Sequence, residues 1–122
     1  MHCESMRRPD GEGIRLRFTG DVGGQRIAII LALPKLERGQ AGGEYPTVVT
    51  FMVEGSGRFF STPHLDNCWS DIARQDPVTD STDRYHLAGK LYCVAQQGEI
   101  NGDAAVSIPE LEFLGIVDWS AT

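Results

Sequence analysis

Hydrophobic and polar residues alternate along most of this chain with a period of two. In residues 13–20, Ile14, Leu16 and Phe18 alternate with polar side chains, which is the pattern of a half-buried β-strand. A glycine-rich turn follows, and the apolar run at 27–33 has the length of a strand buried on both faces. The two segments predict a β-hairpin.

The same pattern recurs to the end of the chain, with Gly, Pro or Asn-Gly turn signals between the segments. Further strands are expected at 45–55, 58–62, 84–94, 104–108 and 110–120. Residues 66–75 are the exception, because Trp69, Ile72 and Ala73 have helical spacing after an Asp or Asn cap. The prediction is an all-β fold: an antiparallel β-sandwich, or a barrel, of seven to eight strands with one short helix or helical turn near 66–75.

The length and composition fit one globular domain. The chain has 122 residues, of which 41% are hydrophobic and 23% charged, and this balance is typical of a folded domain with its own core. We assign residues 13–122 to a single β-sandwich domain and residues 1–12 to a flexible N-terminal tail.

The charge and hydropathy of the chain exclude two classes of partner. The net charge is −6 and the longest basic run is Arg7-Arg8, so the basic stripe that a nucleic-acid-binding protein needs is missing. No apolar run approaches the roughly 20 residues of a transmembrane helix. The first residues also lack the apolar core of a signal peptide. The chain is therefore cytoplasmic, or its export signal was removed before Met1, and Cys3 would then suit a lipid anchor.

Cys68 and Cys93 raise the question of redox compartment. By strand alternation Cys93 lies on the same face as Leu87 and Leu91, and Cys68 stands beside the large apolar Trp69, so both thiols are expected in the interior. A disulfide between them is the favoured interpretation and would indicate a periplasmic or extracellular protein. Two separate buried thiols, which would fit a cytoplasmic protein, and a zinc site are the alternatives.

Aspartates crowd the segment between these cysteines. Asp76, Asp80 and Asp83 are candidate calcium ligands, since calcium prefers oxygen-rich loops. Each is also explained locally by turn and loop hydrogen bonding, and the order of an EF-hand loop is missing. No cofactor is otherwise indicated.

Catalytic arrangements are poorly supported. Ser61, His64 and Asp66 supply a triad by residue type, but three positions so close in one loop rarely converge. A Cys93–His86 pair would place its members on opposite faces of one strand. The sequence therefore predicts no catalytic residues and a protein that is not an enzyme.

A binding surface is the remaining candidate. Of the paired rings Phe59 and Phe60, one should face the core and one the solvent, and Phe60 is taken as part of an exposed apolar patch. His86, Lys90 and Tyr92 line the polar face of the strand at 84–94. They form either a polar-aromatic binding surface or an ordinary solvated face.

The C-terminal half, with "CW" followed by "YHLAGKLYC" and "VSIPELEFLGIVDW", resembles small secreted or lipoprotein-type bacterial β-sandwich domains. The resemblance implies a cysteine pair that joins the "YHLAGKLYC" strand to an upstream segment, and an extracytoplasmic address.

Three functions stay open. The first is a non-enzymatic extracytoplasmic domain that binds another protein or a cell-surface component, with loops 34–46 and 63–83 as contact surfaces. The second is a cytoplasmic or phage-derived structural β-domain. The third is a small β-barrel that binds or acts on a hydrophobic ligand.

Overall fold

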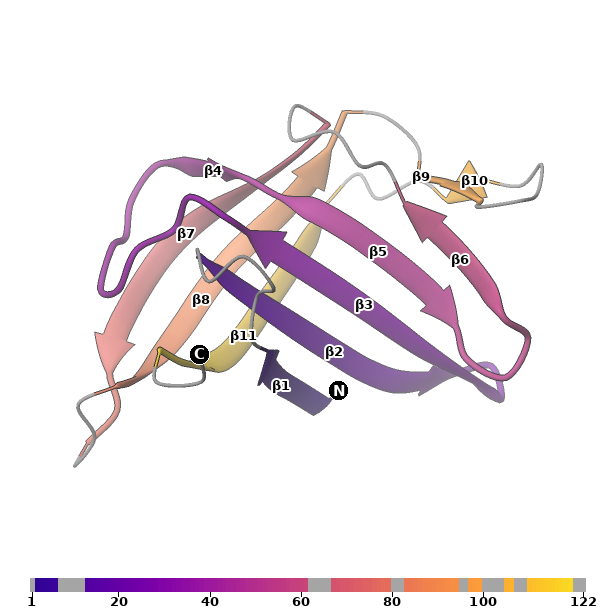
Figure 1. Ribbon diagram of the computed structural model, residues 1–122, viewed down its shortest axis with the longest axis horizontal. Coiled ribbons are helices and arrows are strands. Elements are labelled where there is room, and N and C mark those ends of the chain that lie inside the picture. Colours follow the sequence, from indigo (N-terminus) through magenta and orange to yellow (C-terminus); the bar gives the residue numbers. More distant parts are fainter. Residues whose placement is uncertain are drawn as a thin grey trace.

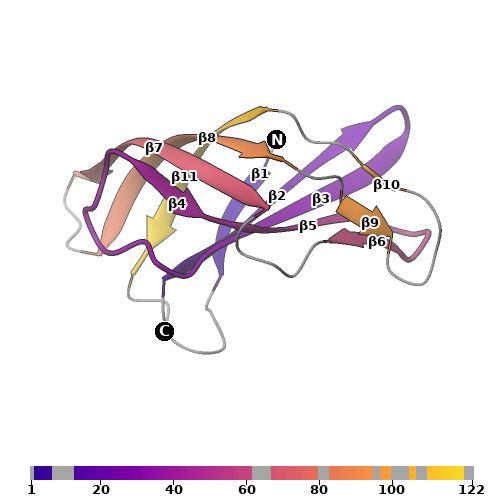
Figure 2. The ribbon, with the colours of Figure 1, turned by 90° about the horizontal axis from the view of Figure 1, so that it is seen from above.

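The chain folds into two antiparallel sheets that share one core (Figures 1 and 2). The structure is a computed structural model. It describes residues 2–6, 13–61, 67–79, 83–94, 97–99, 105–106 and 110–119.

The larger sheet has seven strands in the order β1-β2-β3-β5-β6-β9-β10. Their bounds are β1 (His2–Met6), β2 (Ile14–Val22), β3 (Gln25–Leu33), β5 (Val48–Val53), β6 (Arg58–Ser61), β9 (Gln97–Glu99) and β10 (Ala105–Val106). The β2–β3 turn requires left-handed backbone at Gly23 and Gly24, with φ of 58° and 81°, which glycine adopts at little cost. The predicted first hairpin is therefore present.

The smaller sheet has four strands in the order β11-β8-β7-β4. Their bounds are β11 (Leu111–Asp118), β8 (Arg84–Cys93), β7 (Cys68–Pro77) and β4 (Glu44–Pro46). The strands of the two sheets cross in Figure 1. In both views the end of β7 and the start of β8 lie at one end of the molecule, and β6, β9 and β10 lie at the other.

The core lies where the sheets overlap. Leu16, Leu31 and Val49 are opposite one another across β2, β3 and β5, and all three are fully buried. The four-stranded sheet contributes buried apolar side chains from β7, β8 and β11, namely Ile72, Leu87, Leu91, Phe113 and Val117. Burial of such side chains is the main stabilising contribution in a domain of this size.

This architecture confirms the all-β antiparallel sandwich and corrects four details. The described residues form eleven strands rather than seven or eight. The sheets do not close into a barrel. The helix expected near 66–75 is wrong, because this segment is the long strand β7. Residues 2–6, placed in the flexible tail, form β1 and pair with β2.

A β-bulge interrupts the alternation of β7. The register between β7 and β8 shifts between Ile72 and Arg74, so Ala73 is an extra residue in the strand. Every second side chain is buried from Cys68 through Ser70 to Ile72, and the next buried side chain, Gln75, comes three residues later. The three-residue spacing of Trp69 and Ile72, which resembles a helix, instead joins residues on opposite faces of the strand before the bulge, and Ala73 is the bulged residue itself.

Gly89 of β8 lies between its register partners Ile72 of β7 and Phe113 of β11. A Cβ atom at this position would lie 2.7 Å from Cζ of Phe113 and 3.1 Å from Cδ1 of Ile72. Glycine at position 89 therefore makes room for the Phe113 ring, which also packs against Phe18 of the other sheet with ring centroids 5.9 Å apart.

We predict that Gly89→Ala lowers the free energy of unfolding by about 2 kcal/mol, because the added methyl group overpacks the core. Gly98→Ala is the matched control: a Cβ at Gly98 meets no atom within 4 Å, so its effect should stay within about 0.5 kcal/mol. Chemical denaturation measures both, and Phe113→Leu in the Gly89→Ala background should restore part of the loss. Equal effects at positions 89 and 98 would contradict the packing argument.

Candidate binding face of the four-stranded sheet

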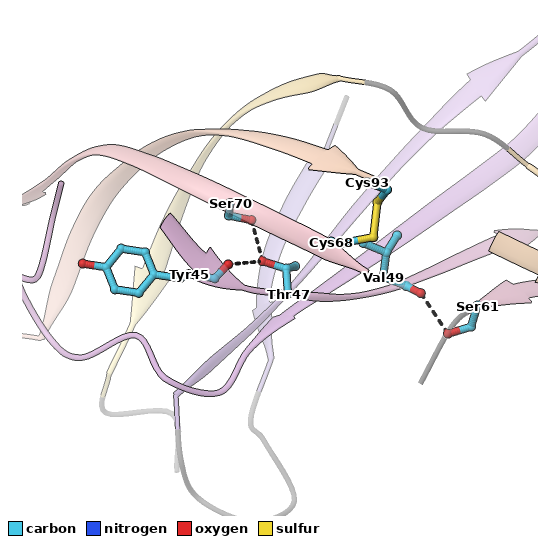
Figure 3. Close-up of a disulfide and its surroundings, with 7 residues drawn as sticks. All are labelled: Tyr45, Thr47, Val49, Ser61, Cys68, Ser70 and Cys93. Carbon is cyan, nitrogen blue, oxygen red and sulfur yellow. Dashed lines mark hydrogen bonds between the residues drawn. A yellow bond between two sulfur atoms is a disulfide. The ribbon is translucent and has the colours of Figure 1, made fainter. Parts of the chain in front are cut away.

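A disulfide joins β7 to β8 at one end of their pairing. Cys68 and Cys93 are direct partners in the register, and their sulfur atoms lie 2.08 Å apart. The Cys68 side chain is fully buried, and Figure 3 shows the bond beside Val49 of the seven-stranded sheet. The predicted pair is therefore confirmed, and neither thiol is available as a zinc ligand or nucleophile.

We predict that the unreduced protein, once unfolded, exposes one alkylatable thiol, Cys3, and that all three cysteines react only after reduction. Mass spectrometry after alkylation counts them. Cys68→Ala with Cys93→Ala should lower the free energy of unfolding by about 3 kcal/mol, because the open loop regains conformational entropy in the unfolded chain. Three reactive thiols in unreduced protein would contradict the disulfide.

Buried hydroxyl groups connect β4 to β7 next to the disulfide (Figure 3). The Thr47 hydroxyl lies 3.0 Å from the Tyr45 carbonyl oxygen, to which it donates, and 2.7 Å from the Ser70 hydroxyl. Because the Thr47 proton points to the carbonyl, Ser70 donates to Thr47. Both hydroxyls are fully buried, so each needs this partner to offset its desolvation.

Gln75 is a buried residue that the sequence did not reveal as important. Its side-chain Nε2 donates to the carbonyl oxygens of Glu37 (3.1 Å) and Gln40 (2.8 Å), and its Oε1 accepts from Nε1 of Trp119 at 2.8 Å. The side chain thus holds loop 34–43 and the end of the last strand against the edge of β7.

We predict that Gln75→Leu destabilises the protein by about 2–3 kcal/mol, because it leaves the Trp119 indole N–H and two carbonyl groups without partners. The control is Gln40→Ala, which removes an exposed side chain that only accepts from the Glu37 amide and should cost less than about 1 kcal/mol. Thermal unfolding followed by tryptophan fluorescence compares the two. An equal loss in both variants would contradict the role of Gln75.

The outer face of the four-stranded sheet carries the predicted residues of β8. His86 and Lys90 are exposed and Tyr92 is half-buried, whereas the alternating residues Leu87 and Leu91 are buried. Phe60 does not belong to any surface: it is 3% exposed, and Phe59 is the ring that faces solvent, at 42%. Phe60 is buried because it packs against Phe51, with ring centroids 5.8 Å apart.

The register assembles a strongly acidic row on this outer face. Directly opposite one another across the four strands lie Glu44, Asp71, Lys90 and Glu112. Lys90 Nζ is 3.1 Å from Glu110 Oε1 and 4.0 Å from Glu112 Oε1. The hydrogen bond and charge of Glu110, followed by the charges of Glu112 and Asp71, raise the pKa of Lys90. We call this set (Glu44, Asp71, Lys90, Glu110, Glu112) the acidic row.

Tyr92 lies beside the acidic row and donates a hydrogen bond from its phenol to Glu44. This hydrogen bond raises the pKa of Tyr92, with burial and the charges of Glu44 and Asp71 adding to the effect. The neutral phenol is favoured because ionisation would put a second negative charge beside a carboxylate.

We predict that Tyr92 ionises at a higher pH in the wild-type protein than in Glu44→Gln, which keeps an acceptor but removes the charge. Because the folded-state pKa is raised, this pair stabilises the fold below the ordinary tyrosine pKa of about 10, and the contribution is lost as the pH rises through the folded-state value. Absorbance at 295 nm follows the ionisation of all tyrosines, and the difference between wild type and Tyr92→Phe gives the contribution of Tyr92. Identical titrations in wild type and Glu44→Gln would contradict this.

A groove opens along the acidic row. Its volume is about 390 Å³, and its lining residues are Asp71, Ala73, Ala88, Gly89, Lys90, Glu112, Phe113 and Leu114. Its apolar side chains include Ala73, Ala88 and Leu114, and Leu114 is 76% exposed. An exposed leucine next to an apolar groove is typical of a contact surface.

A second cavity of about 510 Å³ lies at the start of loop 34–43. Its lining includes Lys35, Glu37, Arg38 and Trp119. Arg38 forms an ion pair with Asp83 at 2.9 Å, so its charge is already compensated. This cavity contains no residue of the predicted binding surface.

The structure does not bring the predicted calcium ligands together within the residues it describes. Asp76 pairs with Arg74 at 3.3 Å and Asp83 with Arg38, and Asp80 lies outside the described residues. In that part of the chain no three His, Cys, Asp or Glu side chains form a metal-binding group. Ser61 donates to the Val49 carbonyl at 2.8 Å, while His64 and Asp66 of the considered triad lie outside the described residues.

The fold and site thus define an antiparallel β-sandwich with a disulfide between the two central strands of its smaller sheet. No protein-family model matches the chain, and neither a curated protein nor a solved structure shows significant similarity to it. Within the described residues, no helix is long and apolar enough to cross a membrane.

Proposed function

We propose that this protein is a non-enzymatic extracytoplasmic domain that binds a partner through the outer face of its four-stranded sheet. The observation that carries the proposal is the groove of about 390 Å³ on that face, with Leu114 exposed at its side. Exposed apolar residues that line a groove lose water when a partner covers them, and this favours binding.

The disulfide supports both the extracytoplasmic location and the role of the outer face in binding a partner. A disulfide that closes a 25-residue separation is characteristic of proteins in oxidising compartments. It also fixes β7 against β8, the two strands that supply Asp71, Ala88 and Lys90 to the groove. A contact surface on paired, cross-linked strands loses little conformational entropy when it binds.

A barrel with a central hydrophobic ligand, considered from the sequence, is not the arrangement found. The sheets remain open, and the space between them is filled by fully buried side chains such as Leu16, Leu31 and Leu91. The cytoplasmic structural subunit remains the second candidate, and it requires Cys68 and Cys93 as free thiols, so thiol counting separates the two.

A photo-crosslinking amino acid at position 114 tests the proposed face. Leu114 is 76% exposed and Phe59, on the outer face of the other sheet, is 42% exposed, so either position accepts the replacement without disturbing the core. In cells of the natural host, the position 114 variant should give a covalent adduct and the position 59 variant should not. Adducts from position 59 alone, or from neither position, would contradict the proposed face.

A further inference from the structure

The chemistry of the groove restricts what can occupy it. Its apolar side chains include Ala73, Ala88 and Leu114, whereas Asp71 and Glu112 contribute carboxylates. The occupant that matches both features is long and apolar for most of its length and carries a positive charge at its end. Lysine and arginine side chains have this form, because they place their methylene groups on apolar surface and keep their charge near water.

The charges around the groove favour the same occupant. The acidic row holds four carboxylates and one ammonium group, and the ammonium group of Lys90 is paired with Glu110 at 3.1 Å. The Asp71 carboxylate makes no hydrogen bond or ion pair with any other described residue. The raised pKa values of Lys90 and Tyr92 both include a contribution from Asp71, so the field at this end of the groove is negative. An anionic or neutral occupant would leave that field unopposed.

We propose that the groove holds a lysine or arginine side chain from a basic segment of a partner protein, with its methylene groups against Ala88 and Gly89 and its charged end at Asp71. This rests on the proposed binding role of the outer face and specifies the chemistry of the partner. The net charge of −6 for the whole chain attracts such a segment from a distance and makes its association dependent on ionic strength.

Three synthetic peptides serve as probes. The first alternates serine with lysine. The second alternates serine with diaminopropionic acid, which has a single methylene group and keeps its charge in mildly acidic buffer, the condition for all three titrations. The third alternates serine with glutamate. Titration of ¹⁵N-labelled protein at low salt should shift the amides of residues 71–73, 88–90 and 112–114 with the lysine peptide. The diaminopropionate peptide should bind roughly threefold more weakly, because it lacks the apolar stem, and the glutamate peptide should cause no shift.

Two substitutions with opposite expected signs test the electrostatic part. Asp71→Asn should raise the dissociation constant of the lysine peptide about threefold, because it removes the carboxylate that meets the ammonium group. Lys90→Gln should lower the dissociation constant of this peptide by a similar factor, because it removes a like charge from the same groove. Asp21→Asn is the matched control, since Asp21 is exposed on the other sheet, and it should leave the affinity unchanged within about 1.5-fold.

The proposal is overturned if the lysine and diaminopropionate peptides bind equally, or if Asp71→Asn and Asp21→Asn have the same effect. It is also overturned if the shifts lie outside the groove or no peptide produces any. An adduct at position 114 with a partner that lacks a basic segment would leave the proposed face standing and reject the basic occupant. The two proposals therefore fail separately.

Discussion

The pairing of β7 with β8 is the constraint on which the rest of the structure depends. The two strands are direct neighbours over nine residue pairs, and the Cys68–Cys93 disulfide fixes their register at one end. In the chain-entropy description, a cross-link of this loop length stabilises the fold by roughly 3 kcal/mol. That is a large part of the free energy of unfolding of a small domain. Strand β4 and loop 34–43 join β7, and β11 joins β8, so every element of the smaller sheet is placed relative to this pair.

The two faces of β8 perform different tasks because alternation separates them. Leu87 and Leu91 pack into the core, while Lys90 and Tyr92 lie on the outer face. On the inner face, Gly89 makes room for the Phe113 ring. On the outer face, Ala88 and Lys90 line the groove. The core contacts and the proposed binding site thus use opposite faces of one strand.

Alternation within single segments was enough to predict the sandwich and the interior position of Cys93, because a strand's period is a local property. The irregular part of the chain was not accessible in this way. Trp69 and Ile72 lie on opposite faces of β7, so their three-residue spacing was a false helical signal, and the bulge at Ala73 then shifted the alternation of the strand. Gln75 matters through partners about 40 residues away, and Asp71 meets Lys90 only through the register. Non-local pairing of this kind has no signal in a single sequence, and the choice between Phe59 and Phe60 needed the strand's orientation toward the core.

Amide hydrogen exchange with the disulfide intact and reduced tests the central claim that the β7–β8 pair organises the smaller sheet. The account predicts that reduction speeds the exchange of amides in β7, β8 and β11, while the central strands β2, β3 and β5 of the larger sheet keep their protection. An unchanged pattern after reduction, or an equal rise in both sheets, would contradict it.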